Sequence, residues 1–232
     1  MSPGFLKCSL STSTLRFAPR KPVLLPPEFA ELPPLPRDFY DRDPRRVSRD
    51  LLGKVLTRRE QKKGVLAARI VEVEAYLGND PAAHCFVGRT KRNEVLWGPP
   101  GLAYVYFIYG NHFCCNVSCL PDGIPGGVLL RALEPLVGIP EMAKARGILT
   151  ADSYDLRQLT SGPGRLAEAF GITRPRDNGK DLTSAASDLW IADDGWPRPR
   201  VEISTRIGIT KAAERLLRYI IPGNRFVSGK TA

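Results

Sequence analysis

The sequence contains only two histidines, His84 and His112, and five cysteines among its 232 residues. It has neither a CxxC nor an HxxxH pair, the spacings by which zinc sites are usually recognised. The close pair Cys115 and Cys119 shares one face of a strand and is interpreted as two small core residues. An odd cysteine count without a secretory signal sequence disfavours a disulfide framework and favours a reducing compartment. We therefore expect neither a metal site nor a disulfide scaffold.

Long hydrophobic runs are also missing. Arg, Glu or Pro interrupts every apolar stretch within about ten residues, whereas a membrane helix needs about 20 apolar residues. No internal repeat is present. Hydrophobic residues make up 43% of the chain, which is enough for a sizeable core. The sequence therefore predicts a soluble protein with one folded domain and no contact with a membrane.

Acidic residues are absent before Glu28, and residues 1–36 hold eight of the 21 prolines. This composition predicts a flexible or poorly packed basic N-terminal arm over 1–36. An organellar transit peptide is the alternative, although no clear amphipathic helix is present. The folded domain is expected over 37–232. Its opening helix is predicted to begin near Asp43-Pro44 and to end at Gly53.

Positive charge is in excess. The chain has 34 Lys and Arg against 24 Asp and Glu, a net charge of +10. Residues 1–65 contribute 14 basic and 7 acidic side chains, so much of the excess is N-terminal. Such a balance is typical of proteins that neutralise phosphates, although solubility or targeting also produces it. The charge favours a polyanionic partner.

Most of the folded part is predicted to be β-structure. Strands are indicated at 55–60, 65–78, 103–109, 112–119 and 126–136. Helices are predicted at 140–146 and 163–170, each between a proline and a glycine, and at 210–219 before Pro222-Gly223. The expected fold is α+β: a single domain with a largely antiparallel, curved β-sheet surrounded by helices.

A tyrosine-rich segment, YVYFIY at 104–109, is followed by Gly110-Asn111 and then by a second β-prone segment. This order predicts a protruding β-hairpin with Tyr109 at its crown. Tyr104 and Tyr106 alternate onto one face of the first strand. Rings in these positions are suited to stacking on nucleobases, while an ordinary sheet that uses tyrosine is the alternative.

The strand predicted at 65–78 changes character at its middle. Its first half is apolar on both faces except at Arg69, whereas Glu72, Glu74 and Tyr76 occupy alternate positions in its second half. A solvated face accounts for two carboxylates, but not for the loss of apolar residues in mid-strand. A turn of small residues then leads to His84. These polar side chains are expected to point into a space other than the core.

These motifs together resemble the alkyladenine (3-methylpurine) DNA glycosylase family of base-excision repair. The resemblance covers about residues 36–222 and leaves the N-terminal arm without a counterpart. It is carried by four ordered segments: RIVEVEAYLGNDPAAHCFVGRTKRN, PGLAYVYFIYGNHFCCNVSC, GVLLRALEPL and LTSGPGRLAEAFGI. The resemblance implies a monomer that acts on double-stranded DNA containing damaged purines. In a bacterium it would work in the cytoplasm and nucleoid, and otherwise in the nucleus or an organelle.

The resemblance also implies base flipping, in which the damaged nucleotide leaves the duplex at a cost of a few kcal/mol. Tyr109 matches the residue that is inserted from the minor groove to fill the gap, and Asn111 and His112 support it.

Four further residues match the family's base pocket. The flipped base is expected between Tyr76 on one side and Tyr106 and His84 on the other, a sandwich that favours electron-poor alkylated purines. Asn116 matches the residue near the purine edge that discriminates against the exocyclic amino group of guanine.

The chemistry implied by the resemblance needs no cofactor. Glu74 matches the catalytic carboxylate that activates water for attack on C1′ of the sugar, and Arg131 matches an active-site residue that favours the charged form. Glu72 is interpreted as structural or hydrogen-bonding. Because water is the nucleophile, the product is an abasic site in an uncut strand, with no covalent lysine.

Two other classes of function fit part of the pattern. A non-catalytic DNA-binding protein would keep the hairpin and the basic surface, but Glu74, Tyr76 and Arg131 together argue against it. An unrelated hydrolase would use Glu72 and Glu74 as a carboxylate pair. Side chains on one strand face point in parallel, however, instead of flanking a substrate.

Overall fold

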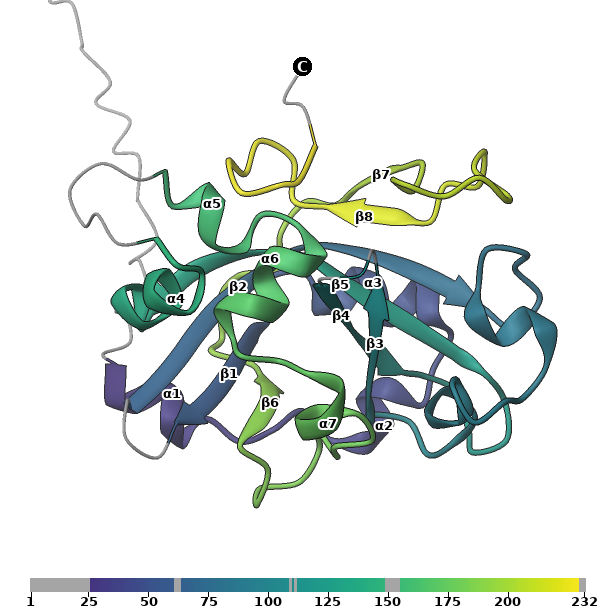
Figure 1. The fold of residues 1–232 in the computed structure, drawn as a ribbon, viewed down its shortest axis with the longest axis horizontal. Coiled ribbons are helices and arrows are strands. Elements are labelled where there is room, and N and C mark those ends of the chain that lie inside the picture. Colours follow the sequence, from purple (N-terminus) through teal and green to yellow (C-terminus); the bar gives the residue numbers. More distant parts are fainter. Residues whose placement is uncertain (1–25, 61–63, 109, 111, 149–154, 230–232) are drawn as a thin grey trace, which may run out of the picture.

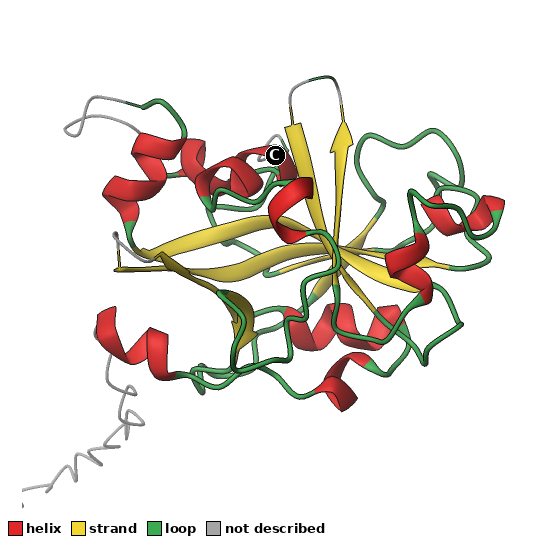
Figure 2. Cartoon of the chain, turned by 60° about the horizontal axis from the view of Figure 1, so that its bottom comes forward, coloured by secondary structure: helices red, strands yellow, loops and turns green. Residues whose placement is uncertain are grey.

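The computed structural model describes residues 26–60, 64–108, 110, 112–148 and 155–229. In these residues one curved sheet runs through the molecule with helices around it, as Figure 1 and Figure 2 show. Every strand pairing described is antiparallel. The predicted α+β class is confirmed. None of the helices in these ranges has the length and apolar character needed to cross a bilayer.

The main path of the sheet has the strand order β3-β4-β5-β2-β1-β6, and β8 pairs with both β2 and β7. The strands are β1 (Val55–Glu60), β2 (Gly64–Leu77), β3 (Ala103–Ile108), β4 (His112–Ser118), β5 (Gly126–Val137), β6 (Leu189–Ala192), β7 (Glu202–Ser204) and β8 (Arg218–Ile220). The five predicted strands are present with boundaries shifted by at most a residue or two. The strands that sequence patterns missed are the three shortest, β6 to β8.

The helices are short. They are α1 (Pro26–Glu31), α2 (Arg37–Tyr40), α3 (Pro44–Leu51), α4 (Ile139–Ala145), α5 (Arg157–Thr160), α6 (Pro163–Ala169) and α7 (Arg174–Asp177), with 3₁₀ turns η1 (His84–Val87) and η2 (Glu94–Trp97). Helix α3 begins as predicted, because the Asp43 side chain accepts a hydrogen bond from the backbone N–H of Arg45. It buries Val47 and Leu51 against the sheet.

The helix predicted at 210–219 is wrong. Residues 210–215 form bends and one turn, with Ala212 at a positive φ of 48°, and β8 follows after two irregular residues. The Leu217 carbonyl accepts from the Ala75 N–H at 2.8 Å, and Tyr219 pairs with Val73. Leu217, Tyr219 and Ile221 are buried at alternate positions, the period of a strand. Backbone pairing with β2 has therefore overridden the local helix signals.

Part of the expected N-terminal arm is packed. Phe29 and Leu35 are buried, and the Leu35 N–H donates to the Ile191 carbonyl at 2.8 Å. The indole of Trp190 donates to the Leu32 carbonyl at 3.0 Å. The expectation of a poorly packed arm is thus wrong for residues 28–36, whose apolar side chains cover the β1 and β6 side of the sheet. Residues 1–25 lie outside the described residues.

The core lies along the long central strands β2 and β5. Val71, Val73 and Ala75 are fully buried, as predicted for one face of β2. Cys115 and Cys119 are free thiols within the same core, which confirms their interpretation as small core residues. The polar half of β2 borders this core, so the site below is built on a rigid central strand.

Candidate active site

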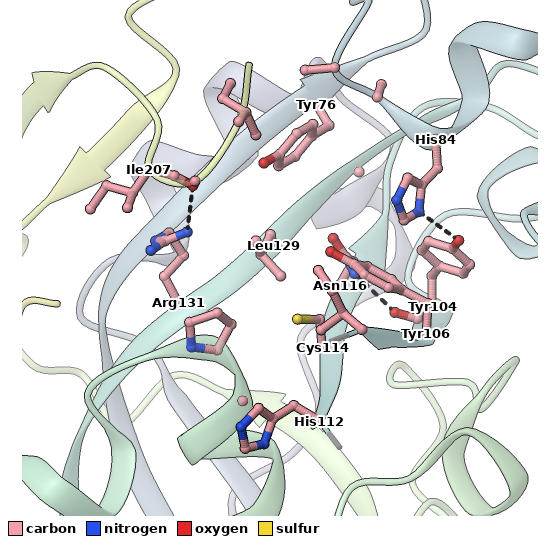
Figure 3. Close-up of a pocket in the computed structure, with 18 of the residues that line it drawn as sticks. Tyr76, His84, Tyr104, Tyr106, His112, Cys114, Asn116, Leu129, Arg131 and Ile207 are labelled. Carbon is pink, nitrogen blue, oxygen red and sulfur yellow. Dashed lines mark hydrogen bonds between the residues drawn. The ribbon is translucent and has the colours of Figure 1, made fainter. Parts of the chain in front are cut away.

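A cavity of about 490 Å³ lies beside the polar half of β2, bordered by β3, β4 and β5 (Figure 3). The turn at η1 and the segments 161–165 and 207–209 complete its wall. Its lining includes Tyr76, Ala83, His84, Tyr104, Tyr106, His112, Cys114, Asn116, Leu129, Arg131, Gly162, Arg165 and Ile207. A cavity with aromatic walls and few polar groups is a typical small-molecule or base pocket.

Aromatic side chains form its walls. The rings of His84 and Tyr106 meet edge to face with centroids 4.4 Å apart, and Tyr104 lies 5.5 Å from Tyr106. Tyr76 projects into the cavity from β2 (Figure 3). The predicted sharing of one face by Tyr104 and Tyr106 is confirmed, because both line this cavity. Tyr76 from β2 and Tyr106 from β3 thus supply flat surfaces on different sides of the cavity.

His84 is held as a neutral ring. Its Nδ1 lies 2.9 Å from the hydroxyl of Tyr104. Burial and the nearby charge of Arg92 lower the pKa of His84, while burial raises the pKa of Tyr104 to about 12. Both groups are therefore uncharged near neutral pH, and the pair fixes the imidazole in the wall.

Asn116 lies at the inner edge of the cavity and is 7% exposed. Its Nδ2 donates to the Tyr104 carbonyl at 3.1 Å. This bond fixes the amide in the cavity wall, so the residue is suited to reading the polar edge of a ligand.

Glu74 is completely buried beside the cavity and has three partners. Its Oε2 accepts from the Tyr76 hydroxyl at 2.9 Å, and its Oε1 accepts from the Ile207 N–H at 2.8 Å. Arg131 Nη1 lies 3.2 Å from Oε1. Burial and the Glu74 charge raise the pKa of Tyr76, which keeps the phenol protonated as a donor. The carboxylate is therefore held in one orientation by groups that themselves line the cavity.

Glu72 is equally buried, but it faces a different set of groups. Its Oε1 accepts from Arg131 Nε at 3.0 Å, from Arg218 Nε at 2.7 Å and from the Ser228 hydroxyl at 2.9 Å. It does not line the cavity. A solvated face is thus excluded for both carboxylates, and the two do not flank a common space as a hydrolytic pair requires.

Arg131 owes its direction to an irregularity in the pairing of β2 with β5. Glu72 pairs with Ala132, and Val73 pairs with Leu130, so Arg131 is an extra residue on β5. Such bulges turn side chains out of regular alternation and are frequent beside active sites. Burial disfavours the charged guanidinium, but the two carboxylates outweigh burial and raise its pKa.

His112 stands at the mouth of the cavity, where β4 begins and the backbone of α6 approaches closely. A Cβ at Gly164 would lie only 3.0 Å from the His112 ring. A larger residue at this position would push the His112 ring aside by a few tenths of an ångström.

Six of the nine predicted site residues line this cavity: Tyr76, His84, Tyr106, His112, Asn116 and Arg131. Glu74 lies directly behind three of the lining groups. Tyr109 and Asn111 lie outside the described residues. The strands β3 and β4 that lead to them pair from Ala103 with Val117 to Ile108 with His112.

Residues that sequence reasoning missed come from the C-terminal third. Ile207 meets Glu74 and Arg131 through its backbone N–H and carbonyl, and no side-chain pattern could have indicated these contacts. Arg218 and Ser228 reach Glu72 from 146 and 156 residues away. The SGPG run at 161–164 was part of the family resemblance, and its density of small residues was the available signal for a close approach.

Comparison with known proteins agrees with the motifs. The family model of methylpurine-DNA glycosylase matches residues 38–225. A protein of Koribacter versatilis (strain Ellin345), named as a candidate 3-methyladenine DNA glycosylase, is 61% identical over 202 residues, which cover 87% of this chain and 96% of that protein. Proteins of the same name from Burkholderia lata and Methanoculleus marisnigri are 48% and 46% identical. Those alignments cover 84% of this chain and 91% and 98% of the two proteins.

The family predicted from the ordered motifs is thereby confirmed. The matched residues begin within α2 and end after β8, so they include strands β1 to β8 and every segment that lines the cavity. The chain belongs to the methylpurine-DNA glycosylase family.

Proposed function

We propose that this protein is a monofunctional DNA glycosylase that flips alkylated or deaminated purines out of duplex DNA and hydrolyses their N-glycosidic bond. The observation that carries the proposal is the buried Glu74 and Arg131 pair at the edge of an aromatic cavity. The printed names of the relatives, which refer to 3-methyladenine, support the substrate class.

The cavity has the surfaces that a flipped purine needs. Tyr76 supplies one stacking surface, and Tyr106 with His84 supplies another. Stacking on aromatic side chains stabilises a nucleobase by about 1–3 kcal/mol, which offsets much of the cost of unstacking it from the duplex. A base that carries a positive charge gains additional cation–π attraction. Asn116 is then the group that rejects the exocyclic amino group of normal guanine.

The water that attacks C1′ of the sugar is proposed to bind among Glu74, Arg131 and the Ile207 backbone. Figure 3 shows the hydrogen bond from Arg131 Nη1 to the Ile207 carbonyl, which is 3.5 Å long. The same Nη1 lies 3.2 Å from Glu74 Oε1. In this position a water can donate to the carboxylate and to the carbonyl. Glu74 would accept its proton as the oxygen bonds to C1′ and the bond from C1′ to the purine breaks.

The charge that develops during the reaction also supports the assignment of Glu74 as the catalytic carboxylate. Positive charge that develops on the sugar is stabilised by the nearby Glu74 carboxylate. A cationic methylpurine leaves as a neutral base, whereas hypoxanthine must also acquire a proton, which balances the proton that the attacking water gives up. The products are the free base and an abasic site in an uncut strand.

The remaining expectations complete the proposal. Tyr109, with Asn111 and His112 beside it, is proposed to fill the gap left in the duplex from the minor groove. We propose that the protein acts as a monomer, without a cofactor, on double-stranded DNA. Its compartment would be that of the DNA: the cytoplasm and nucleoid of a bacterium, or otherwise the nucleus or an organelle.

The test is release of free base from duplexes that contain one 7-methylguanine or one hypoxanthine, with a chelator present and undamaged duplex as the control. We expect both lesions to be released by the wild-type protein and retained after Glu74→Gln. Binding without release by the wild-type protein would instead favour a non-catalytic DNA-binding role.

A further inference from the structure

Arg206, two residues after β7, is a buried cation that the proposed chemistry does not use. Its side chain is 0% exposed and forms a two-bond ion pair with Asp80, which is also 0% exposed. The guanidinium also donates to the carbonyls of Ala75 at 3.2 Å and Ala212 at 3.3 Å. These four hydrogen bonds are more than a surface arginine needs to stay in place. Its guanidinium is therefore held in one orientation.

This cation lies against the stacking wall of the cavity. The Arg206 Cζ is 4.6 Å from the centroid of the Tyr76 ring. Tyr76 lines the cavity and Arg206 does not, so the guanidinium covers the ring face that is turned away from the cavity. The next residue, Ile207, donates its N–H to Glu74. Arg206 therefore sets both the plane of Tyr76 and the position of the peptide that orients Glu74.

A cation behind the ring changes what the front of the ring attracts. The π-system of a tyrosine draws in a cation through its electron-rich faces. When one face is already occupied by a guanidinium, that cation draws on the same π-electrons, so a second positive charge on the opposite face is attracted less. A neutral purine stacks on the same ring without this penalty.

We propose that Arg206, held by Asp80, is a positioning residue that sets lesion specificity: through Tyr76 it disfavours cationic methylpurines relative to neutral damaged purines. The inference rests on the proposed function. The motifs implied that the whole aromatic sandwich favours a cationic base. With Arg206 on the other face of Tyr76, only the wall formed by Tyr106 and His84 keeps that preference.

The test compares Arg206→Met with wild type on duplexes that carry one cationic 7-methylguanine or one neutral hypoxanthine. Single-turnover release and binding affinity are measured for each lesion at the same salt concentration. We expect the ratio of 7-methylguanine to hypoxanthine affinity to rise about two- to fivefold in the variant, the scale of one cation–π contact. A purely structural role would lower both affinities and leave the ratio unchanged.

Arg58→Met is the matched control. It removes another fully buried ion pair, Arg58 with Asp177, whose Nη2 to Oδ1 distance is 2.8 Å, and neither residue lines the cavity. It should cost stability without changing the lesion ratio. If Arg206→Met does not fold, Arg206→Lys serves, since the shorter ammonium cannot cover the ring while still pairing with Asp80.

The outcomes are distinct. An unchanged ratio in the Arg206 variant that folds, or the same change in Arg58→Met, would overturn the inference while leaving the proposed function intact. Failure of the wild-type protein to release either base would count against the proposed function itself.

Discussion

Arg131 and Glu74 form a buried ion pair across β5 and β2, with Nη1 3.2 Å from Oε1. The same guanidinium uses its Nε to bind Glu72. One arginine therefore separates two carboxylates that alternate on one strand: Glu74 faces groups that line the cavity, and Glu72 faces the C-terminal segment. This division predicts different consequences for removing each charge.

Glu74→Gln should bind lesion-containing DNA but release base at least about 10²–10⁴-fold more slowly, because an amide cannot accept the proton of water. Glu72→Gln should instead destabilise the fold by about 1–3 kcal/mol, since it weakens the charged acceptor shared by two guanidiniums and Ser228. Single-turnover kinetics and urea unfolding of both variants measure the two effects. A wild-type rate in Glu74→Gln would remove this residue from the mechanism, and a selective loss of rate in Glu72→Gln would transfer the role.

Because water is the proposed nucleophile, borohydride added during turnover should trap no adduct between protein and DNA. The abasic product should stay uncut until it is treated with alkali. Lys91, the lysine nearest in sequence to the pocket wall at His84, is the residue to test. A trapped adduct that disappears in Lys91→Ala would establish a Schiff base and contradict the hydrolytic mechanism.

Tyr109 and Tyr106 should differ in how they affect binding. Tyr109→Ser should weaken binding of a lesion in duplex DNA by up to a few kcal/mol, but not of a lesion in a bulge that leaves no gap to fill. Tyr106→Ala removes a pocket wall and should weaken both by about 1–3 kcal/mol. Affinities at fixed salt provide the comparison. Equal effects of Tyr109→Ser on the two substrates would show that it is not the wedge, and His112 would be tested next.

His84 should make stability depend on pH in the mildly acidic range. Its pKa in the folded protein is lowered below 6.5, so the unfolded chain binds more protons between the two pKa values. Stability is therefore expected to fall as pH drops below 6.5 and to level off below the folded pKa.

Urea unfolding between pH 5 and 7.5 measures this effect, with His84→Gln as the comparison, because glutamine can still meet the Tyr104 hydroxyl. The dependence of the unfolding free energy on pH should be weaker in that variant. Asp43, Asp181 and Asp188, whose pKa values are lowered from 3.8, titrate outside this window. An unaltered slope in His84→Gln would assign the pH dependence to another group.

The loop after η1 should contact phosphates. Asn93 closes it by donating to the carbonyls of His84 and Gly88 at 2.9 and 2.8 Å, which leaves Arg89 and Lys91 exposed beside the cavity wall. Arg89→Ala and Lys91→Ala should each reduce the slope of log Kd against log salt by about 1, with little change in lesion preference. Arg198→Ala, at an exposed arginine paired with Asp50, is the control. A slope unchanged in all three variants would place the DNA backbone elsewhere.

Patterns of neighbouring residues were enough to locate the main elements. The alternation of apolar residues defined β2, and the Asp43-Pro44 cap defined the start of α3, because both depend on interactions within a few residues. The ordered motifs also brought Glu74, Tyr76, His84, Tyr106, Asn116 and Arg131 together as one site. The same local reasoning failed at 210–219, where pairing with β2 decides the backbone conformation.

The sequence alone was thus sufficient for the family, the strand-rich fold and the six predicted site residues that line the cavity. The resemblance assigned different roles to Glu72 and Glu74, but alternation along the strand could not, because both side chains point to the same face of β2. The tertiary structure shows the physical difference, which lies mainly in the distant groups that each carboxylate meets. Arg218, Ser228 and Ile207 reach them from more than 130 residues away. The bulge at Arg131 and the stacking of Arg206 on Tyr76 arise in the same way, from contacts between segments whose spacing along the chain carries no periodic signal.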